Sequence, residues 1–122
     1  MDILFFTIPK PKVVCAYDDM TVKEVYDLLE DNHFTAIPII NRDGFYVGTI
    51  TEGDLLRFIM KNNLDRELTV NSKIIEVERL RDLEPIKKTA KMQDLILKAS
   101  NQNFVPIVEE DGIFIGIVTR KE

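Results

Sequence analysis

Short apolar runs alternate with amphipathic segments along this chain of 122 residues. Residues 36–40 read AIPII and residues 45–50 read FYVGTI, and the turn-forming stretch NRDG at 41–44 separates them. Asp-Gly between two apolar runs indicates a β-hairpin, because glycine readily takes the positive φ that such a turn requires. The pattern therefore predicts two short strands joined by a tight turn.

An amphipathic helix is predicted before this hairpin, and a short extended stretch, KVVCAY at 12–17, precedes the helix. Thr21 and Glu24 have the spacing of a capping box, in which each side chain accepts a hydrogen bond from the other residue's amide. Apolar residues then recur at the spacing of one helical face. They are Val22, Val25, Tyr26 and Leu29. A second helix is expected after the hairpin, with Asp54 capping its first turn.

The same order of predicted strands and helices occurs twice along the chain. A shift of 68 residues places 35–51 over 103–119 without a gap and aligns Pro38 with Pro106. The shift also carries Thr21 onto Thr89, so the second copy is expected to begin its helix at Thr89. The apolar stripe expected on that helix consists of Met92, Leu95, Ile96 and Ala99.

The repeat predicts an α/β fold of two β-α-β-β-α type copies related by a pseudo-twofold axis. One copy has too little chain to bury its own sheet, so we expect two small sheets packed together with helices outside. The first repeat with an N-terminal arm would cover 1–61, a polar connector 62–80, and the second repeat 81–122. The second repeat has no counterpart of the helix after Asp54 within this sequence.

Composition narrows the possible functions. A formal net charge of −5 argues against general binding to nucleic acid or to an anionic membrane. The single Cys15 excludes an internal disulfide, and one histidine leaves no plausible zinc ligand set. The N-terminal residues do not resemble a signal peptide, and no apolar run approaches the roughly 20 residues that cross a bilayer. These features predict a cytoplasmic protein.

The candidate chemistry lies in a phrase that occurs twice, GTITEGD at 48–54 and GIVTRKE at 116–122. Gly48 permits close approach of a ligand or of backbone. Thr51 offers a hydroxyl to a phosphate oxygen, and the carboxylate of Asp54 suits the two vicinal hydroxyls of a ribose. The alternative is purely structural, with Thr51 closing a turn and Asp54 capping a helix. The residues alone leave both interpretations open.

These features resemble the cystathionine-β-synthase (CBS) domain pair, or Bateman module. The apolar-Pro-apolar strands, the Asp-Gly turns and the doubled Gly-x-x-Thr phrase carry the resemblance, which covers roughly residues 12–60 and 80–122. In that family, ligands bind in clefts between the repeats. Transferred by position, the resemblance implies one cleft with Thr51, Asp54, backbone of 83–86, Asn103 and Phe104. It implies a second cleft with Thr119, Arg120, Lys12, Val13, Val14, Thr35 and Ala36, next to Ile37 and Pro38. Glu122 stands where the family usually has Asp.

The resemblance implies a regulatory module that binds AMP, ADP or ATP and passes the change to a protein partner. Stand-alone bacterial CBS pairs that bind cyclic di-AMP show a more specific likeness, in Lys12-Val13, Thr35-Ala36 and Thr119-Arg120. S-adenosylmethionine binding and a purely structural dimerisation module are further alternatives. The sequence shows no nucleophile with a base and no paired carboxylates at a recognisable spacing, so we do not expect an enzyme. No cofactor is expected to be required.

A homodimer is also expected, because one segment of the chain is too apolar for a free helix face. That segment contains Leu55, Leu56, Phe58, Ile59 and Met60.

Overall fold

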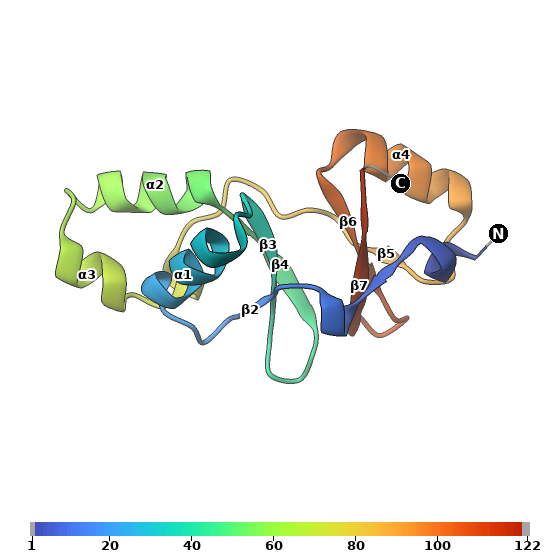
Figure 1. The fold of residues 1–122 in the computed structure, drawn as a ribbon, viewed down its shortest axis with the longest axis horizontal. Coiled ribbons are helices and arrows are strands. Elements are labelled where there is room, and N and C mark those ends of the chain that lie inside the picture. Colours follow the sequence, from blue (N-terminus) through green and yellow to red (C-terminus); the bar gives the residue numbers. More distant parts are fainter. Residues whose placement is uncertain (1, 121–122) are drawn as a thin grey trace. The chain divides into compact units, whose positions relative to one another are not determined.

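The computed structural model describes residues 2–120 and divides into two compact units. Unit 1 combines the chain up to residue 14, residues 43–46 and the chain from residue 83 onward, and unit 2 combines residues 15–42 and 47–82. The units therefore interleave along the sequence, as the colours of Figure 1 show.

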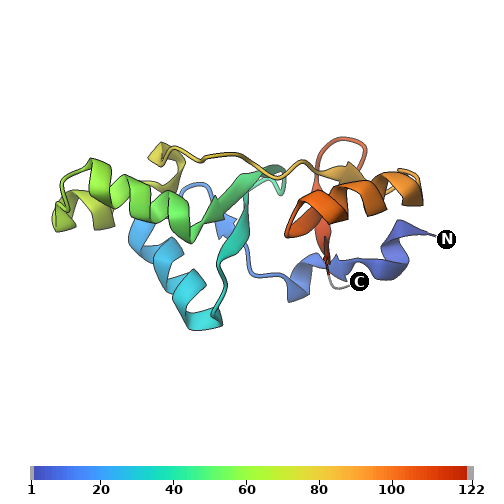
Figure 2. The same ribbon diagram turned by 90° about the horizontal axis from the view of Figure 1, so that it is seen from above.

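Unit 2 contains a three-stranded sheet in the order β2-β3-β4 and three helices. The strands are β2 (Ala16–Tyr17), β3 (Ala36–Ile40) and β4 (Tyr46–Thr51, of which Tyr46 belongs to unit 1). The helices are α1 (Val22–Asn32), α2 (Glu52–Lys61) and α3 (Arg66–Asn71), followed by a 3-10 turn at Ile74–Glu76. Strand β2 runs parallel to β3. The three helices contact one another beside the sheet (Figures 1 and 2).

Unit 1 contains a four-stranded mixed sheet in the order β1-β7-β6-β5. The strands are β1 (Ile8–Pro9), β5 (Ile86–Lys87), β6 (Phe104–Val108) and β7 (Phe114–Thr119), and the helix is α4 (Met92–Asn101). Two 3-10 turns, at Ile3–Phe6 and Lys10–Lys12, flank β1. Strand β1 pairs antiparallel with β7, and β5 pairs parallel with β6. The core of this unit is formed by Ile3, Ile86, Leu95, Val105, Ile107 and Val118.

Much of the predicted local structure is confirmed. The fold is α/β, and the strands AIPII and FVPIV have the predicted bounds. The capping box of α1 is present, with the amide of Thr21 donating to Glu24 Oε1 at 2.9 Å and the amide of Glu24 donating to Thr21 Oγ1 at 3.2 Å. Val25 and Leu29 are buried as expected, but Tyr26 is 49% exposed. Its ring lies at the edge of the apolar face, not within it.

The two helix starts after the first helix were predicted at the wrong residues. Helix α2 begins at Glu52, with Thr51 as its N-cap, so Asp54 lies inside the first turn. Helix α4 begins after Lys91, which makes no side-chain capping bond, and not at Thr89. Thr89 instead donates its hydroxyl to the carboxylate of Glu110. Helix α4 buries Leu95 but leaves Ile96 63% exposed, so the predicted stripe was partly wrong.

The strand register explains the misplaced start of α4. Ala16 on β2 pairs with Ile39, and the equivalent Ile86 on β5 pairs with Ile107. Ala16 and Ile86 are 70 residues apart, whereas Ile39 and Ile107 are 68 apart. The second copy is therefore two residues shorter between these strands, and the constant shift read from the sequence fails before the helix.

The connector contains more structure than its polar composition predicts. Asp65 caps α3 by accepting a hydrogen bond from the amide of Leu68 at 3.0 Å. Thr69, Ile74 and Val77 are buried, so three widely spaced residues anchor the segment, and most of its other residues are exposed. Sparse burial of this kind leaves no clear period in the sequence.

The two Asp-Gly turns pair with each other inside unit 1. The amide of Phe114 donates to the carbonyl of Gly44 at 2.9 Å, and the amide of Tyr46 donates to the carbonyl of Gly112 at 3.2 Å. These four residues are equivalent in pairs in the repeat, so the contact is reciprocal. Gly44 and Gly112 have φ of 92° and 98°, the left-handed conformation that the turn prediction requires.

Candidate functional site

The first copy of the repeated phrase forms the junction between β4 and α2. The amide of Asp54 donates to Thr51 Oγ1 at 3.1 Å, and the amide of Thr51 donates to Asp54 Oδ2 at 3.0 Å. Thr51 and Asp54 thus form a capping box that satisfies two amides at the start of the helix. The structural role considered from the sequence is present.

The carboxylate of Asp54 is 1% exposed and holds two further donors. Its Oδ1 accepts a hydrogen bond from the amide of Leu80 at 3.0 Å and pairs with Arg57 Nη2 at 2.5 Å. The Arg57 side chain is about half exposed, so water screens this ion pair from one side. A ribose that used Asp54 would have to share or replace these partners.

Gly48 admits a side chain from the connector. The amide of Thr49 donates to Asp82 Oδ1 at 2.9 Å, and a Cβ built on Gly48 would overlap the Asp82 carboxylate. Arg79 Nε donates to the same oxygen at 2.7 Å. The close approach predicted at Gly48 is therefore made by Asp82.

Equivalent backbone bonds position the residues around both phrases. In unit 2, the amide of Glu52 donates to the carbonyl of Thr35 at 2.9 Å, so Thr35 lies beside the start of α2. In unit 1, the amide of Arg120 donates to the carbonyl of Asn103 at 3.3 Å, and Thr119 pairs with Phe104. The structure thus places Thr119 and Arg120 beside Asn103 and Phe104, which the resemblance assigned to the other cleft. The Arg120 side chain is exposed.

The other predicted residues of unit 1 lie toward the opposite end of β7. Strand β1 runs antiparallel to β7, with Pro9 opposite Gly116. The chain after Pro9 therefore runs toward the Phe114 end of β7 and away from Arg120. Six residues of strand span about 20 Å. Lys12, Val13 and Val14 follow this path, so the structure does not gather them around Arg120.

The predicted residues of β3 have different exposures. Ala36 is half-buried, whereas Ile37 is 1% exposed and Pro38 is also buried. The side chains of Ile37 and Pro38 are thus part of the core of unit 2 and are not exposed to a ligand.

Two side chains that the sequence did not single out occupy the backbone of residues 83–86. Tyr46 donates its hydroxyl to the carbonyl of Leu83 at 2.7 Å. The buried Gln102 accepts from the amide of Glu84 at 2.9 Å and donates to its carbonyl at 3.2 Å. A purine reading this backbone would meet groups that are already hydrogen-bonded. The signal in the sequence is a polar residue, Gln102, two positions before the apolar strand β6.

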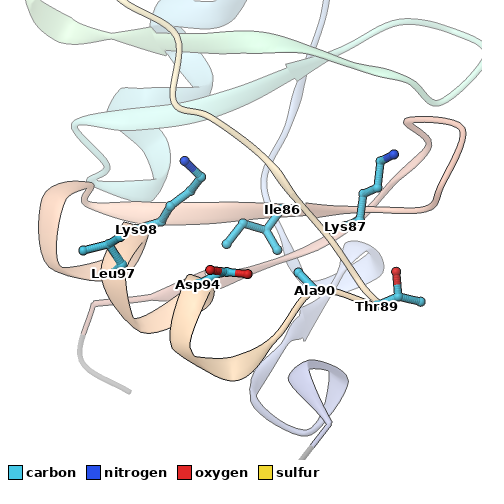
Figure 3. Close-up of a pocket in the computed structure, with 7 residues that line it drawn as sticks. All are labelled: Ile86, Lys87, Thr89, Ala90, Asp94, Leu97 and Lys98. Carbon is cyan, nitrogen blue, oxygen red and sulfur yellow. The ribbon is translucent and has the colours of Figure 1, made fainter.

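A cavity of about 450 Å³ lies between β5 and α4, as Figure 3 shows. Its lysines are paired, since Lys98 Nζ lies 3.0 Å from Glu84 Oε2 and Lys87 Nζ lies 3.6 Å from Glu110 Oε2. Ile86, the last residue of the predicted backbone stretch 83–86, lines this cavity, whereas the other predicted residues within 2–120 do not. The lining residues are Ile86, Lys87, Thr89, Ala90, Asp94, Leu97 and Lys98.

The clearest perturbed acid in unit 2 is structural. Arg42 donates to both oxygens of Asp19, at 2.8 and 2.9 Å, and this hydrogen bonding lowers the pKa of Asp19 below its ordinary value. The guanidinium also lies 3.8 Å from the ring centroid of Tyr17. The group ties β2 to the end of β3 and is separate from the repeated phrases.

Two further expectations from the sequence concern Glu122 and membrane-spanning helices. Glu122, which stands at the acidic position of the second phrase, lies outside the described residues. Within residues 2–120, every helix is too short or too polar to cross a membrane.

Comparison with known proteins gives consistent results. The CBS domain family model matches residues 6–61 and 77–122, which is well over half of the chain. An uncharacterised protein of Methanocaldococcus jannaschii is 28% identical over 139 aligned positions that include 89% of this chain and 82% of that protein.

Solved structures with the same fold include two that contain adenine nucleotides. A CbpB protein in complex with c-di-AMP is 29% identical, with a TM-score of 0.90, and the match covers 99% of this chain and 80% of that one. CBSX2 in complex with AMP is 22% identical, with a TM-score of 0.75, and the match covers 98% of this chain and 90% of that one. At that identity, the second likeness concerns the fold alone.

Proposed function

The chain belongs to the CBS domain family, and from this premise we propose that it is a regulatory module that binds an adenine nucleotide, preferably cyclic di-AMP. The observation that carries the choice of ligand is the similarity to CbpB, which extends over nearly the whole chain. It favours the cyclic dinucleotide, the alternative drawn from the sequence, over AMP, ADP or ATP.

The second phrase supports a ligand with phosphates. Arg120 is exposed immediately after Thr119, at the end of β7, and its backbone is fixed by the bond to Asn103. A planar guanidinium can bind a phosphate through two parallel hydrogen bonds. A ligand with two nucleotide units also reaches further along β7, toward Lys12, than a mononucleotide does.

The first phrase supports the same preference. A mononucleotide of the AMP type depends on its free ribose diol, and the predicted partner of that diol is Asp54. The Asp54 carboxylate already accepts from Thr51, Leu80 and Arg57. Cyclic di-AMP has its 3′ oxygens in phosphodiester bonds and therefore relies less on a diol.

A regulatory role requires that the nucleotide bind one conformation more tightly than another. A ligand that prefers one conformation shifts the population toward it, and a protein partner that recognises this conformation is then engaged or released. In this proposal the bound nucleotide is a signal and is not converted chemically.

A ligand panel tests the proposal. Cyclic di-AMP, AMP, ATP and S-adenosylmethionine would each be added during thermal unfolding, because a ligand at 100 times its Kd stabilises the folded state by about 2.7 kcal/mol. We expect the largest rise in Tm with cyclic di-AMP and a Kd from calorimetry that agrees with it. No rise with any of the four ligands at millimolar concentration would refute nucleotide binding and leave the structural dimerisation module.

A further inference from the structure

Residues 79–82, where the predicted connector ends and the second predicted repeat begins, are here called the strap, and they bond directly to the first phrase. The strap has no helix or strand of its own and follows the buried Val77. The backbone amide of Leu80 donates to the Asp54 carboxylate, and the Asp82 carboxylate accepts from the amide of Thr49. Both partners lie in GTITEGD, and all of these residues belong to unit 2.

The strap presents the same two groups as a nucleotide. A ribose hydroxyl would donate to Asp54, and here the amide of Leu80 donates to it at 3.0 Å. Asp82 Oδ1 accepts from the amide of Thr49 at 2.9 Å, and its carboxylate fills the close approach at Gly48. A donor thus occupies the carboxylate that the sequence assigned to ribose, and an anion two residues later occupies the space at Gly48 that the sequence offered to a ligand or to backbone.

The strap is held by few bonds. The side chain of Asp82 is 39% exposed and that of its partner Arg79 is 17% exposed, so water reaches this ion pair mainly from the Asp82 side. The side chain of Leu80 is 78% exposed, so its residue is fixed through the amide and not through burial. Three of the four strap side chains are exposed, so a ligand that displaces Leu80 and Asp82 uncovers little beyond the side chain of Arg79.

We propose that the strap is an intramolecular competitor that closes the first phrase until an adenine nucleotide displaces it. This inference rests on the proposed function, since it requires that a nucleotide binds. It adds that Gly48 and Asp54 of the first phrase are covered by the chain itself, through Asp82 and the amide of Leu80.

The test combines amide exchange with nucleotide binding in Asp82→Ala. Its matched control is Glu78→Ala, which removes the same charge from an exposed position of the same connector. Both are made in an Arg120→Ala background, so that the second phrase is weakened, and AMP is the probe because it carries a free ribose diol. We expect Asp82→Ala to speed exchange of the Thr49 and Leu80 amides at least tenfold and to tighten AMP binding at least threefold. Glu78→Ala should have the same amide exchange rates and the same AMP affinity as the Arg120→Ala protein.

Wild-type protein supplies a second readout. Saturating AMP should speed exchange at the Leu80 amide, because the ligand takes its place on Asp54, and a merely structural contact would not respond in this way. Asp82→Asn, which keeps the side-chain volume, serves if the alanine variant does not fold, and it should give the same changes in smaller size.

The outcomes separate the two proposals. Faster exchange in the Asp82 variant with unchanged or weaker AMP binding would make the strap a structural contact and overturn the inference. Unchanged exchange would overturn it as well. If wild type binds cyclic di-AMP while the strap variants behave like their parent, the inference fails and the proposed function stands. If neither nucleotide binds any of the proteins, the proposed function itself fails.

Discussion

Leu80 donates its backbone amide to the carboxylate of Asp54, 26 positions earlier in the chain, at 3.0 Å. The bond joins the connector to the first turn of α2. The buried carboxylate of Asp54 therefore forms half of a capping box and also anchors a distant loop.

Removal of this carboxylate should destabilise the fold. Asp54→Ala leaves the amides of Thr51 and Leu80 without their acceptor, and we expect the free energy of unfolding to fall by about 2–4 kcal/mol. Urea denaturation would measure it. Asp27→Ala, which breaks an exposed i,i+4 ion pair with Lys23 on α1, should cost less than about 0.5 kcal/mol. Equal losses for the two variants would contradict this role of Asp54.

The same variant tests ribose recognition. If Asp54 also binds a ribose diol, Asp54→Ala should weaken AMP by roughly 1.5–3 kcal/mol and leave a 2′-deoxy analogue almost unaffected. Calorimetry measures the affinity of both ligands for the same folded variant. Any general effect of the substitution on stability is then common to both ligands and cancels in the comparison. The same loss for both ligands would restrict Asp54 to its capping and anchoring roles.

The side chain of Arg120 should bind the phosphate groups of the ligand. Arg120→Ala is expected to weaken cyclic di-AMP and ATP about tenfold or more, adenosine much less, and the difference should shrink as salt rises. Calorimetry at two ionic strengths measures it. Arg66→Ala, another exposed arginine, on α3, is the control and should change none of the affinities. An unaltered affinity for both phosphate ligands would show that the Arg120 side chain points to solvent.

A homodimer remains a prediction, with its surface now better defined. Leu55 of the predicted apolar segment is buried, whereas Leu56 and Met60 are 60% and 58% exposed on α2. Leu56→Glu should therefore produce monomers in sedimentation experiments. Leu64→Glu, at an equally exposed leucine outside α2, should leave the dimer intact. A wild-type monomer at tens of micromolar would remove the prediction.

Arg42 should set the pKa of Asp19. In Arg42→Leu we expect that pKa to return to its ordinary value near 3.8, measured by NMR titration of the carboxyl group. Because the folded-state pKa is lowered, the stabilisation by this pair is present above pH 3.8 and is lost as pH falls through the folded-state value. Arg81→Leu, in the connector, should leave the Asp19 titration unchanged.

The elements that the sequence predicted well are those whose signals are local. The capping box of Thr21 and Glu24 and the Asp-Gly turns each need only a few neighbouring residues, and both are present. The start of α4 was misplaced because the repeat register was taken as constant, although the second copy is two residues shorter between its first two strands.

The contacts of the candidate site could not be predicted in the same way. The role of Asp82 depends on a contact with Thr49 across 33 residues, and the residues around Asp82 carry three other acids with no local distinction. Gly48 indicated a close approach but not which group makes it. The sequence thus located the first phrase but did not show that the connector occupies it.

The reciprocal pairing of the two Asp-Gly turns has a consequence for the ancestry of the chain. Gly44 with Phe114 and Tyr46 with Gly112 are two copies of one bond. A surface that bonds to its own copy is the kind by which identical molecules form a symmetric dimer. In a protein with one repeat, this bond would form between two molecules and would weaken on dilution. When both copies lie in one chain, the bond forms within a single molecule, and the linker fixes the local concentration of the partner turn.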